Sequence, residues 1–146
     1  MKKYILGALG ILLLIALLLP GCSSGAKSGG KEVVITYSAN TSSHIGTLLI
    51  SFEPKPGNIF IVLDMTIENH GYATFALDPL AFSIVANGTT YKRAMVVGLE
   101  NEILMGVVKD NSSTTGKLAF EVPADTGSFD VQYKGEDNDT IRWVKQ

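Results

Sequence analysis

The chain has 146 residues and a formal net charge of −2, a length that suits a single domain with its own core. Beyond residue 21 it carries 10 basic and 14 acidic side chains, a net charge of −4. Its only arginines, Arg93 and Arg142, are far apart. Because phosphate binding needs clustered basic side chains, this composition argues against a nucleic-acid partner. The single cysteine, Cys22, excludes an intrachain disulfide.

The N-terminus has the features of an export signal. Lys2 and Lys3 precede an apolar run over residues 5–19. As a helix this run spans about 22 Å, less than the roughly 30 Å of a bilayer core, so a stable transmembrane helix is the weaker interpretation. Leu19-Pro20-Gly21-Cys22 resembles the lipobox of prokaryotic lipoproteins. The resemblance implies cleavage before Cys22 and a diacylglyceryl group on its sulfur. A plain secretory signal and an uncleaved anchor stay open.

Three parts follow from this interpretation. Residues 1–21 are predicted to be a lipoprotein signal peptide and residues 22–30 a lipidated flexible tether. Residues 31–146 are predicted to be one folded domain. Small and polar side chains give residues 23–30 a root-mean-square span of about 16 Å, which keeps the domain near the membrane. We expect a lipid anchor in the cell membrane, with the domain on the extracellular or periplasmic side.

The domain shows short β-type segments separated by turn residues. Strands are predicted over residues 31–37, 47–52, 57–71, 72–77, 80–86, 89–93, 117–122, 128–133 and 140–145. Residues 38–46 and 109–116 are predicted to be a polar turn and a loop, and residues 135–139 an acidic turn. Residues 95–108 fit a strand, a helical turn or a packed loop. Asn87-Gly88 between two β-type segments predicts a type I′ hairpin.

Residues 57–71 form the predicted central strand. One face is wholly apolar, and its members are Ile59, Ile61, Leu63, Met65 and Ile67. The other face begins apolar and becomes polar at Asp64. A catalytic carboxylate would need a partner, so we expect Asp64 to face solvent or to pair with a Lys, Arg or Tyr across the sheet. Residues 80–86 alternate in the same way, with Leu80, Phe82 and Ile84 predicted to face inward.

The strand pattern predicts an all-β, immunoglobulin-like antiparallel β-sandwich. A long strand ends in Met65-Thr66-Ile67-Glu68-Asn69, a hairpin runs from Phe82 to Tyr91, and the motif Gly-x-Leu-x-Phe-x-Val-Pro occupies residues 116–123. This order resembles a lipoprotein domain family of unknown function related to the mycobacterial immunoprotective extracellular antigen. The resemblance implies an immunoglobulin-like sandwich on a microbial surface and supplies no mechanism. Residues 111–115 depart from the Pro-Gly pair that the family tends to have before this motif.

Four N-x-S/T sequons are candidates for N-glycosylation: Asn40, Asn87, Asn111 and Asn138. All four are predicted to lie in loops or turns. Turns are rich in Asn, Ser and Thr in any protein, so modification depends on a host with that machinery, such as an archaeon. A tight hairpin would make Asn87 a poor acceptor.

Two weak metal candidates complete the inventory. The acidic residues 136–139 resemble a calcium loop only in composition, and a solvated turn explains them better. His44 and His70, with Met65, Met95 and Met105, could imitate a soft copper site, but no ligand spacing motif supports one. We predict no metal site and no cofactor.

No nucleophile motif or phosphate-binding glycine loop occurs in the sequence, so we predict that the protein is not an enzyme. The leading hypothesis is a membrane-anchored surface lipoprotein whose domain binds an unknown protein, glycan or envelope component. One alternative is a glycosylated structural spacer. The other is a surface protein that handles copper or calcium.

Overall fold

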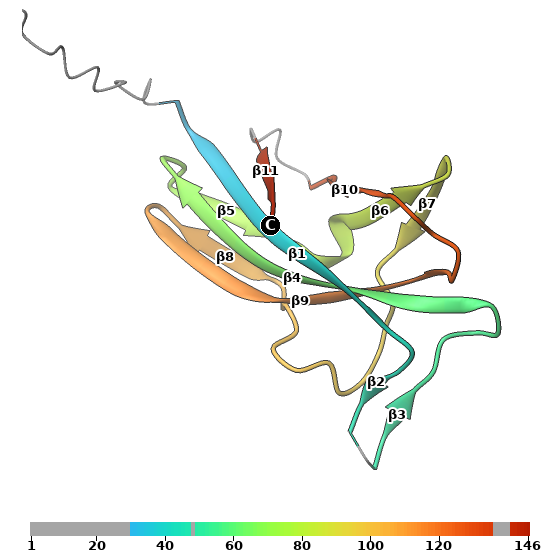
Figure 1. Cartoon of the computed structure of the whole chain (residues 1–146). Coiled ribbons are helices and arrows are strands. Elements are labelled where there is room, and N and C mark those ends of the chain that lie inside the picture. The colour runs from blue at the N-terminus through green and yellow to red at the C-terminus, as the bar shows by residue number, and fades with distance from the viewer. Residues whose placement is uncertain (1–29, 48, 136–140) are drawn as a thin grey trace, which may run out of the picture.

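The computed structural model describes residues 30–47, 49–135 and 141–146 (Figure 1). The proposed signal peptide, Cys22 and the acidic turn at 136–139 lie outside these residues. The strands are β1 (Glu32–Ser42), β2 (Ile45–Gly46), β3 (Ser51–Phe52), β4 (Asn58–His70), β5 (Thr74–Leu77), β6 (Phe82–Ala86), β7 (Thr89–Lys92), β8 (Gly106–Lys109), β9 (Ser112–Pro123), β10 (Asp130–Tyr133) and β11 (Ile141–Lys145). One 3₁₀ turn, η1 (Pro79–Ala81), precedes β6.

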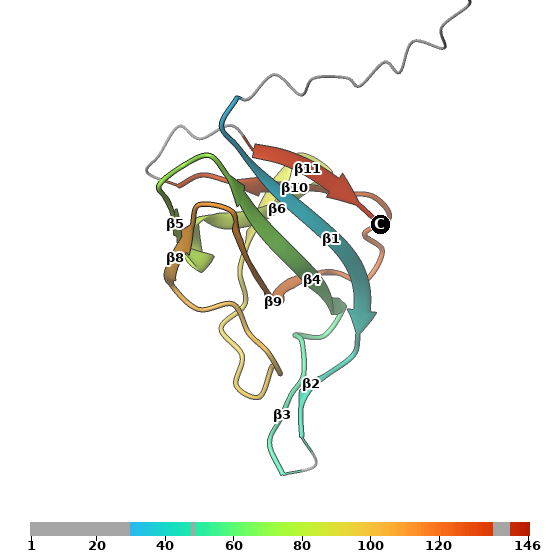
Figure 2. The ribbon, with the colours of Figure 1, turned by 90° about the vertical axis from the view of Figure 1, so that its left-hand side faces the viewer.

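The strands form a β-sandwich, which confirms the predicted fold class. The larger sheet has the order β11-β1-β4-β9, and the second has the order β10-β6-β7. Two short pairs, β2-β3 and β5-β8, complete the described part. Figure 2 shows β11, β1 and β4 side by side in the larger sheet. The paired strands of the described part run antiparallel apart from β1 and β11, which run parallel, so the predicted antiparallel sandwich has this one exception.

The central strand is confirmed as β4. Ile61, Leu63, Met65 and Ile67 face the core between the sheets and are buried. On the opposite face Phe60 lies in a second, smaller apolar cluster, whereas Asp64 is exposed. The core is completed by side chains from both layers: Val33, Ile35, Tyr37, Phe75, Leu77, Phe82, Ile84, Ile103, Val108, Leu118, Phe120, Val122 and Val131.

The Asn87-Gly88 hairpin is also confirmed. β6 and β7 pair directly across it, with Ala86 opposite Thr89. Asn87 has φ 51° and Gly88 has φ 75°, and two consecutive positive φ values are what a type I′ turn requires. Asn and Gly tolerate this conformation better than other residues do, which is why the dipeptide was a reliable signal.

Residues 47–52 were predicted to be one strand, but only Ser51 and Phe52 are strand, as β3, and Thr47 and Ile50 belong to the reversal between β2 and β3. Thr47 N–H donates to the Ile50 carbonyl over 2.8 Å and closes the reversal. Gly46 makes this possible, because a Cβ there would lie 2.1 Å from the Ile50 oxygen. The prediction was wrong because a run of β-type residues does not reveal a turn made by backbone contacts.

Two segments predicted as a polar turn and a loop are largely strand. β1 continues through Ser42, and β9 begins at Ser112 after a tight turn at Asp110-Asn111. Both additions pair with β4, which is the longest described strand. Long-range pairing therefore overrides the local polar composition. Leu80 also departs from its predicted inward position, because it lies in η1 and is 56% exposed.

Candidate functional site

The two ends of the larger sheet differ in chemistry. We call the end where the chain enters β1 the N-terminal pole; it includes Lys31, His70 and Asn111. We call the opposite end the far pole; it consists of the β2-β3 hairpin and residues 94–99. Figures 1 and 2 both show the hairpin and the segment between β7 and β8 extending from the same end of the molecule.

The far pole presents apolar side chains to solvent. Leu49 is 94% exposed, Ile50 53%, Met95 74% and Val97 59%. Single exposed apolar residues are normal, whereas several gathered on one surface are characteristic of interaction sites. The far pole therefore has the apolar character of an interaction surface.

Packing beneath the far pole fixes these side chains in their outward positions. Val96 and Leu99 pack against the small cluster formed by Ile45, Phe60 and Ala119. The Ala94 N–H donates to the Ala119 carbonyl over 2.7 Å. Because Ala94 and Val96 face the cluster, Met95 and Val97, which alternate with them, point to solvent.

A close backbone approach joins the two parts of the far pole. Gly98 has φ 87°, and a Cβ built on it would lie 3.1 Å from the Cα of Gly46. Both positions therefore favour glycine. The hairpin and the 94–99 segment meet at these glycines and form one surface rather than two.

A half-buried ion pair closes the base of the segment that carries Met95 and Val97. The Arg93 guanidinium contacts the Glu102 carboxylate, with side-chain exposures of 12% and 22%. Two backbone hydrogen bonds to β9 follow: Lys117 N–H to the Asn101 carbonyl at 2.8 Å and Ile103 N–H to the Lys117 carbonyl at 3.1 Å. The segment is thus held at both ends against the edge of β9.

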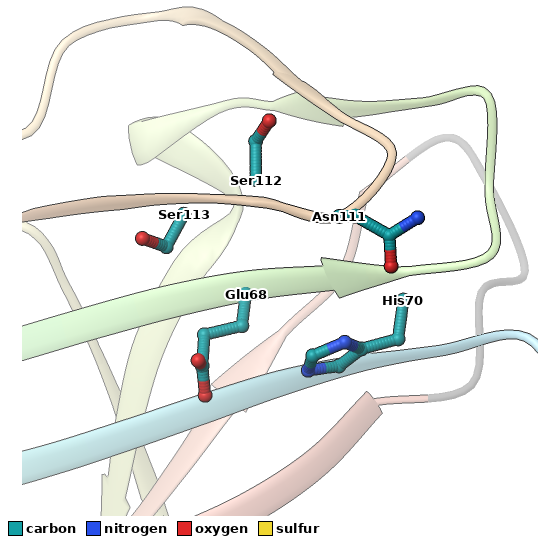
Figure 3. A pocket seen from close by; sticks show the side chains of 5 residues that line it. All are labelled: Glu68, His70, Asn111, Ser112 and Ser113. Atoms are coloured by element: carbon teal, nitrogen blue, oxygen red, sulfur yellow. The ribbon is translucent and has the colours of Figure 1, made fainter.

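The N-terminal pole carries a small polar hollow of about 150 Å³. Figure 3 shows its lining, which comes from the end of β4 and the start of β9: Glu68, His70, Asn111, Ser112 and Ser113. Hydroxyl, amide, carboxylate and imidazole groups meet there. Within the described residues no group of three or more His, Cys, Asp or Glu side chains is placed to hold a metal ion.

Asn69 lies buried beneath this hollow. Its Nδ2 donates to the Tyr72 and Val108 carbonyls, each over 2.9 Å, and its Oδ1 accepts from Tyr72 N–H at 3.2 Å. Its own carbonyl accepts from Asn111 N–H at 2.9 Å. The Asn that ends the quoted strand motif therefore supports the N-terminal pole structurally.

A larger hollow of about 360 Å³ lies between β5, β8 and the end of β10. Leu77, Met105 and Tyr133 line it, together with Asp78 and Lys134 at its rim. The Tyr133 hydroxyl donates to the Ala76 carbonyl over 2.8 Å and accepts from Asp78 N–H at 3.2 Å. These bonds tie β10 to β5 and leave a mixed polar and apolar depression.

Hydrogen bonds lower the pKa of one carboxyl group on the larger sheet, that of Glu121. Asn58 Nδ2 donates to Glu121 over 2.7 Å, and Lys55 N–H donates to the same oxygen over 2.9 Å. These bonds, with the nearby Lys55 charge, hold the pKa of Glu121 below its ordinary value of 4.5. They connect the turn before β4 to β9, which is a structural role.

The sequence comparison assigns the family. Residues 26–140 match the family described as a domain of unknown function (DUF4352). The chain belongs to this family. A search of curated proteins finds no match.

A solved structure shows the same fold as this DUF4352 domain. It is the crystal structure, at 2.62 Å resolution, of "a putative lipoprotein (ycdA)" from Bacillus subtilis subsp. subtilis str. 168. The TM-score is 0.55 at 13% sequence identity, over 68% of this chain and 30% of that chain. The DUF4352 protein therefore spans less than a third of its structural relative, and the likeness concerns the fold alone.

The predicted site residues of the DUF4352 domain fall in different places. Cys22 and Asn138 lie outside the described residues. Asn87 and Asn111 are exposed in tight turns, as predicted, with φ values of 51° and 52°. Asn40 is exposed but lies within β1, so its placement in a loop was wrong.

The residues of the copper hypothesis are not brought together. His44 follows the far end of β1, whereas His70 pairs with Glu32 at its start. At about 3.3 Å per residue these positions are roughly 30 Å apart. Met65 is buried in the core, and the exposed Met95 belongs to the far pole.

Asp64 lies where the sequence predicted, at the surface and beside a basic side chain of the neighbouring strand. Its carboxylate is half exposed and lies 3.9 Å from Lys117 Nζ on the neighbouring strand.

Among the described residues, no helix is long and apolar enough to cross a membrane.

The sequence analysis did not predict the far pole. The pattern that could have indicated it is a glycine beside an apolar run, which occurs at Gly46 and again at Gly98.

Proposed function

We propose that this protein is a lipoprotein anchored through Cys22 to the outer side of a cell membrane. Its DUF4352 domain would act there as a non-catalytic binding module. The Leu-x-Gly-Cys sequence at residues 19–22 supports the anchor. The description of its Bacillus subtilis structural relative as a lipoprotein is in keeping with it. Two acyl chains on one cysteine would give stable attachment.

The observation that carries the binding role is the far pole. Leu49, Ile50, Met95 and Val97 expose apolar surface at the end of the sheet away from the start of β1. A domain held at its N-terminus presents this end outward. Apolar side chains favour a protein partner over a glycan, because burying them on association gives a hydrophobic gain.

The anchor is tested by substituting Cys22→Ala and fractionating cells. We expect the variant in the medium or the soluble fraction and the wild type in the membrane fraction. Ser23→Ala is the control and should stay membrane-bound. A Cys22→Ala protein that stays in the membrane fraction would rule out lipid attachment at this residue.

The binding role is tested by cross-linked pull-down from intact cells. Leu49→Ser and Met95→Ser each remove apolar surface from the far pole and should reduce recovery of a partner. Val107→Thr is the matched control, because Val107 is 63% exposed but lies on β8, away from the far pole. Equal recovery with all three variants would place the binding surface elsewhere.

A second proposal, the glycosylated spacer, has an observation of its own. Asn40, Asn87 and Asn111 are all exposed, which modification requires, and the tight hairpin makes Asn87 the poorest acceptor of the three. The intact mass of the native protein tests this: added hexose-type mass supports it, and the bare mass of polypeptide plus lipid refutes it.

Elemental analysis of the same sample tests the alternative that the protein handles copper or calcium.

The kinship to the mycobacterial immunoprotective antigen is also kept as a proposal. It rests on the order of the strand, hairpin and Gly-x-Leu-x-Phe-x-Val-Pro motifs. A crystal structure of this domain compared with that antigen would test it, because shared strand order including the parallel β1-β11 pair is the expected result. A different strand order would reject the kinship.

A further inference from the structure

The strand that follows the tether lies inside the larger sheet and is held on both sides. All 11 residues of β1 pair with β4, from Glu32 opposite His70 to Ser42 opposite Phe60. On its other side Val33–Tyr37 pair with Ile141–Lys145 of β11. Figure 2 shows β1 between these two strands. A pull on the tether therefore reaches a strand with two hydrogen-bonded neighbours.

The direction of β1 decides how such a pull acts. The chain enters β1 at one end of the sheet, and the strand runs from there toward the far pole. A force that draws the tether away from the domain is directed along β1. The inter-strand hydrogen bonds lie across the strands, so the force loads these bonds in shear, and many must break together. A force that separates two strands from one end breaks the same bonds one after another.

The core adds to this resistance. Val33 and Ile35 are fully buried, and Tyr37 is nearly so. Sliding β1 by one residue would turn these side chains out of the core and bring the residues of the opposite face, Val34 and Thr36, into it. Close packing allows no intermediate position for such a slide.

We infer that β1, β4 and β11 form a mechanical clamp, which keeps the domain folded when a bound partner pulls against the membrane anchor. This inference rests on the proposed anchoring at Cys22. It assigns a mechanical role to the parallel β1-β11 pair. Load applied at residues 94–99 of the far pole reaches the tether through β9, β4 and the hydrogen bonds of β1, whereas load on the β2-β3 hairpin runs along the β1 backbone itself.

The clamp is tested by single-molecule pulling on the full chain in detergent, with Cys22→Ala to remove the only native cysteine and one handle on Ser28→Cys in the tether. The second handle is placed on Gln146→Cys for lengthwise load or on His70→Cys for peeling. Gln146 follows β11, and His70 lies opposite Glu32 at the start of β1. We expect a severalfold higher unfolding force through Gln146→Cys. Equal forces in the two geometries would overturn the clamp.

A pair of proline variants tests the β11 contribution. Gln146 N–H donates to the Tyr37 carbonyl over 2.9 Å. Alternate residues of a parallel strand point their N–H groups to the same side, so Val144 N–H points toward β1 and Lys145 N–H toward the free edge. Val144→Pro removes a clamp bond and should lower the lengthwise force clearly. Lys145→Pro removes none and should leave most of that force; an equal loss in both variants would contradict the inference.

The handles are chemical, so these measurements do not depend on lipid attachment. A clamp that fails mechanically leaves the fractionation result at Cys22 unchanged. Failure of the anchor, in contrast, shows as Cys22→Ala in the same cell fraction as the wild type, while the pulling forces stay high.

Discussion

Asn69 Nδ2 donates a 2.9 Å hydrogen bond to the carbonyl oxygen of Val108, 39 residues later in the chain. The bond connects the end of the central strand to β8, which belongs to a different strand pair. A second bond from the same amide group holds the turn at Tyr72. One buried side chain thus joins three segments at the N-terminal pole, and the fold depends on it more than on any surface ion pair.

Replacing Asn69 should be strongly destabilising. Asn69→Ala removes the amide group that bonds the Val108 carbonyl and the Tyr72 N–H, and the expected loss is about 2–4 kcal/mol of unfolding free energy. Urea unfolding followed by circular dichroism measures it. Ser112→Ala is the control, because Ser112 is exposed and lies opposite Asn69 in the ladder. A loss no greater than that of the control would show that the amide network is dispensable.

Gly116 and Gly106 form a matched pair for a packing test. A Cβ on Gly116 would lie 2.6 Å from the Asn101 oxygen and 2.7 Å from Ile103 Cγ1, whereas a Cβ on Gly106 meets nothing within 4 Å. Gly116→Ala should cost about 1–3 kcal/mol through overpacking, and Gly106→Ala close to none. Thermal and urea unfolding of both variants check this, and equal effects would contradict the close approach of residues 101–103 to β9.

The Arg93–Glu102 pair should contribute through its half-buried position. Glu102→Ala leaves the guanidinium without its carboxylate, and we expect a loss of about 1–3 kcal/mol. The double variant Arg93→Met with Glu102→Leu replaces both charges by apolar side chains and should recover part of that loss. Urea unfolding of Arg93→Met, Glu102→Leu, their double variant and the wild type forms a thermodynamic cycle. Strict additivity would mean that the two side chains do not interact.

The Asp64–Lys117 pair should matter little by comparison. At 3.9 Å and with Asp64 half exposed, the pair is of the surface kind, so Asp64→Asn should change the unfolding free energy by less than about 0.5 kcal/mol. Urea unfolding at low and high salt measures this. A loss several times larger would give Asp64 a role that its surroundings do not indicate.

The lowered pKa of Glu121 predicts that the folded domain loses stability as the pH falls into the acid range. Because its folded pKa is lowered below 4.5, the ionised carboxyl stabilises the fold above that pH. Its contribution is lost as the pH falls from 4.5 through the folded pKa. Glu121→Gln should remove this part of the acid loss, so its stability should fall less steeply below pH 4.5. Urea unfolding at a series of pH values compares the two, and parallel profiles would contradict the assignment.

Local patterns in the sequence were sufficient for part of the fold. The alternation in residues 57–71 predicted β4 and its buried face, since both are recorded in consecutive residues. Asn87-Gly88 predicted its hairpin because the dipeptide suits the backbone conformation of that turn. Asp64 was placed correctly because a lone carboxylate in an apolar strand has few alternatives to solvent.

The remaining differences come from contacts between distant segments. Ser112 and its neighbours are strand because β4 offers them partners, and nothing in their own polar sequence indicates this. The far pole was missed because Leu49 and Met95 are apolar residues that the fold leaves exposed, and apolar runs are ordinarily assigned to the core. The parallel pairing of β11 with β1 is a choice of topology that residues 140–145 do not encode locally.

The most direct test of the central claim is site-specific photo-cross-linking in intact cells. A photoreactive residue replaces Leu49 or Met95 at the far pole, or Thr115, which is exposed on β9. A binding module that meets its partner through the far pole predicts an adduct of one discrete mass from positions 49 and 95 and none from 115. The absence of any adduct, or the same adducts from all three positions, would contradict the account.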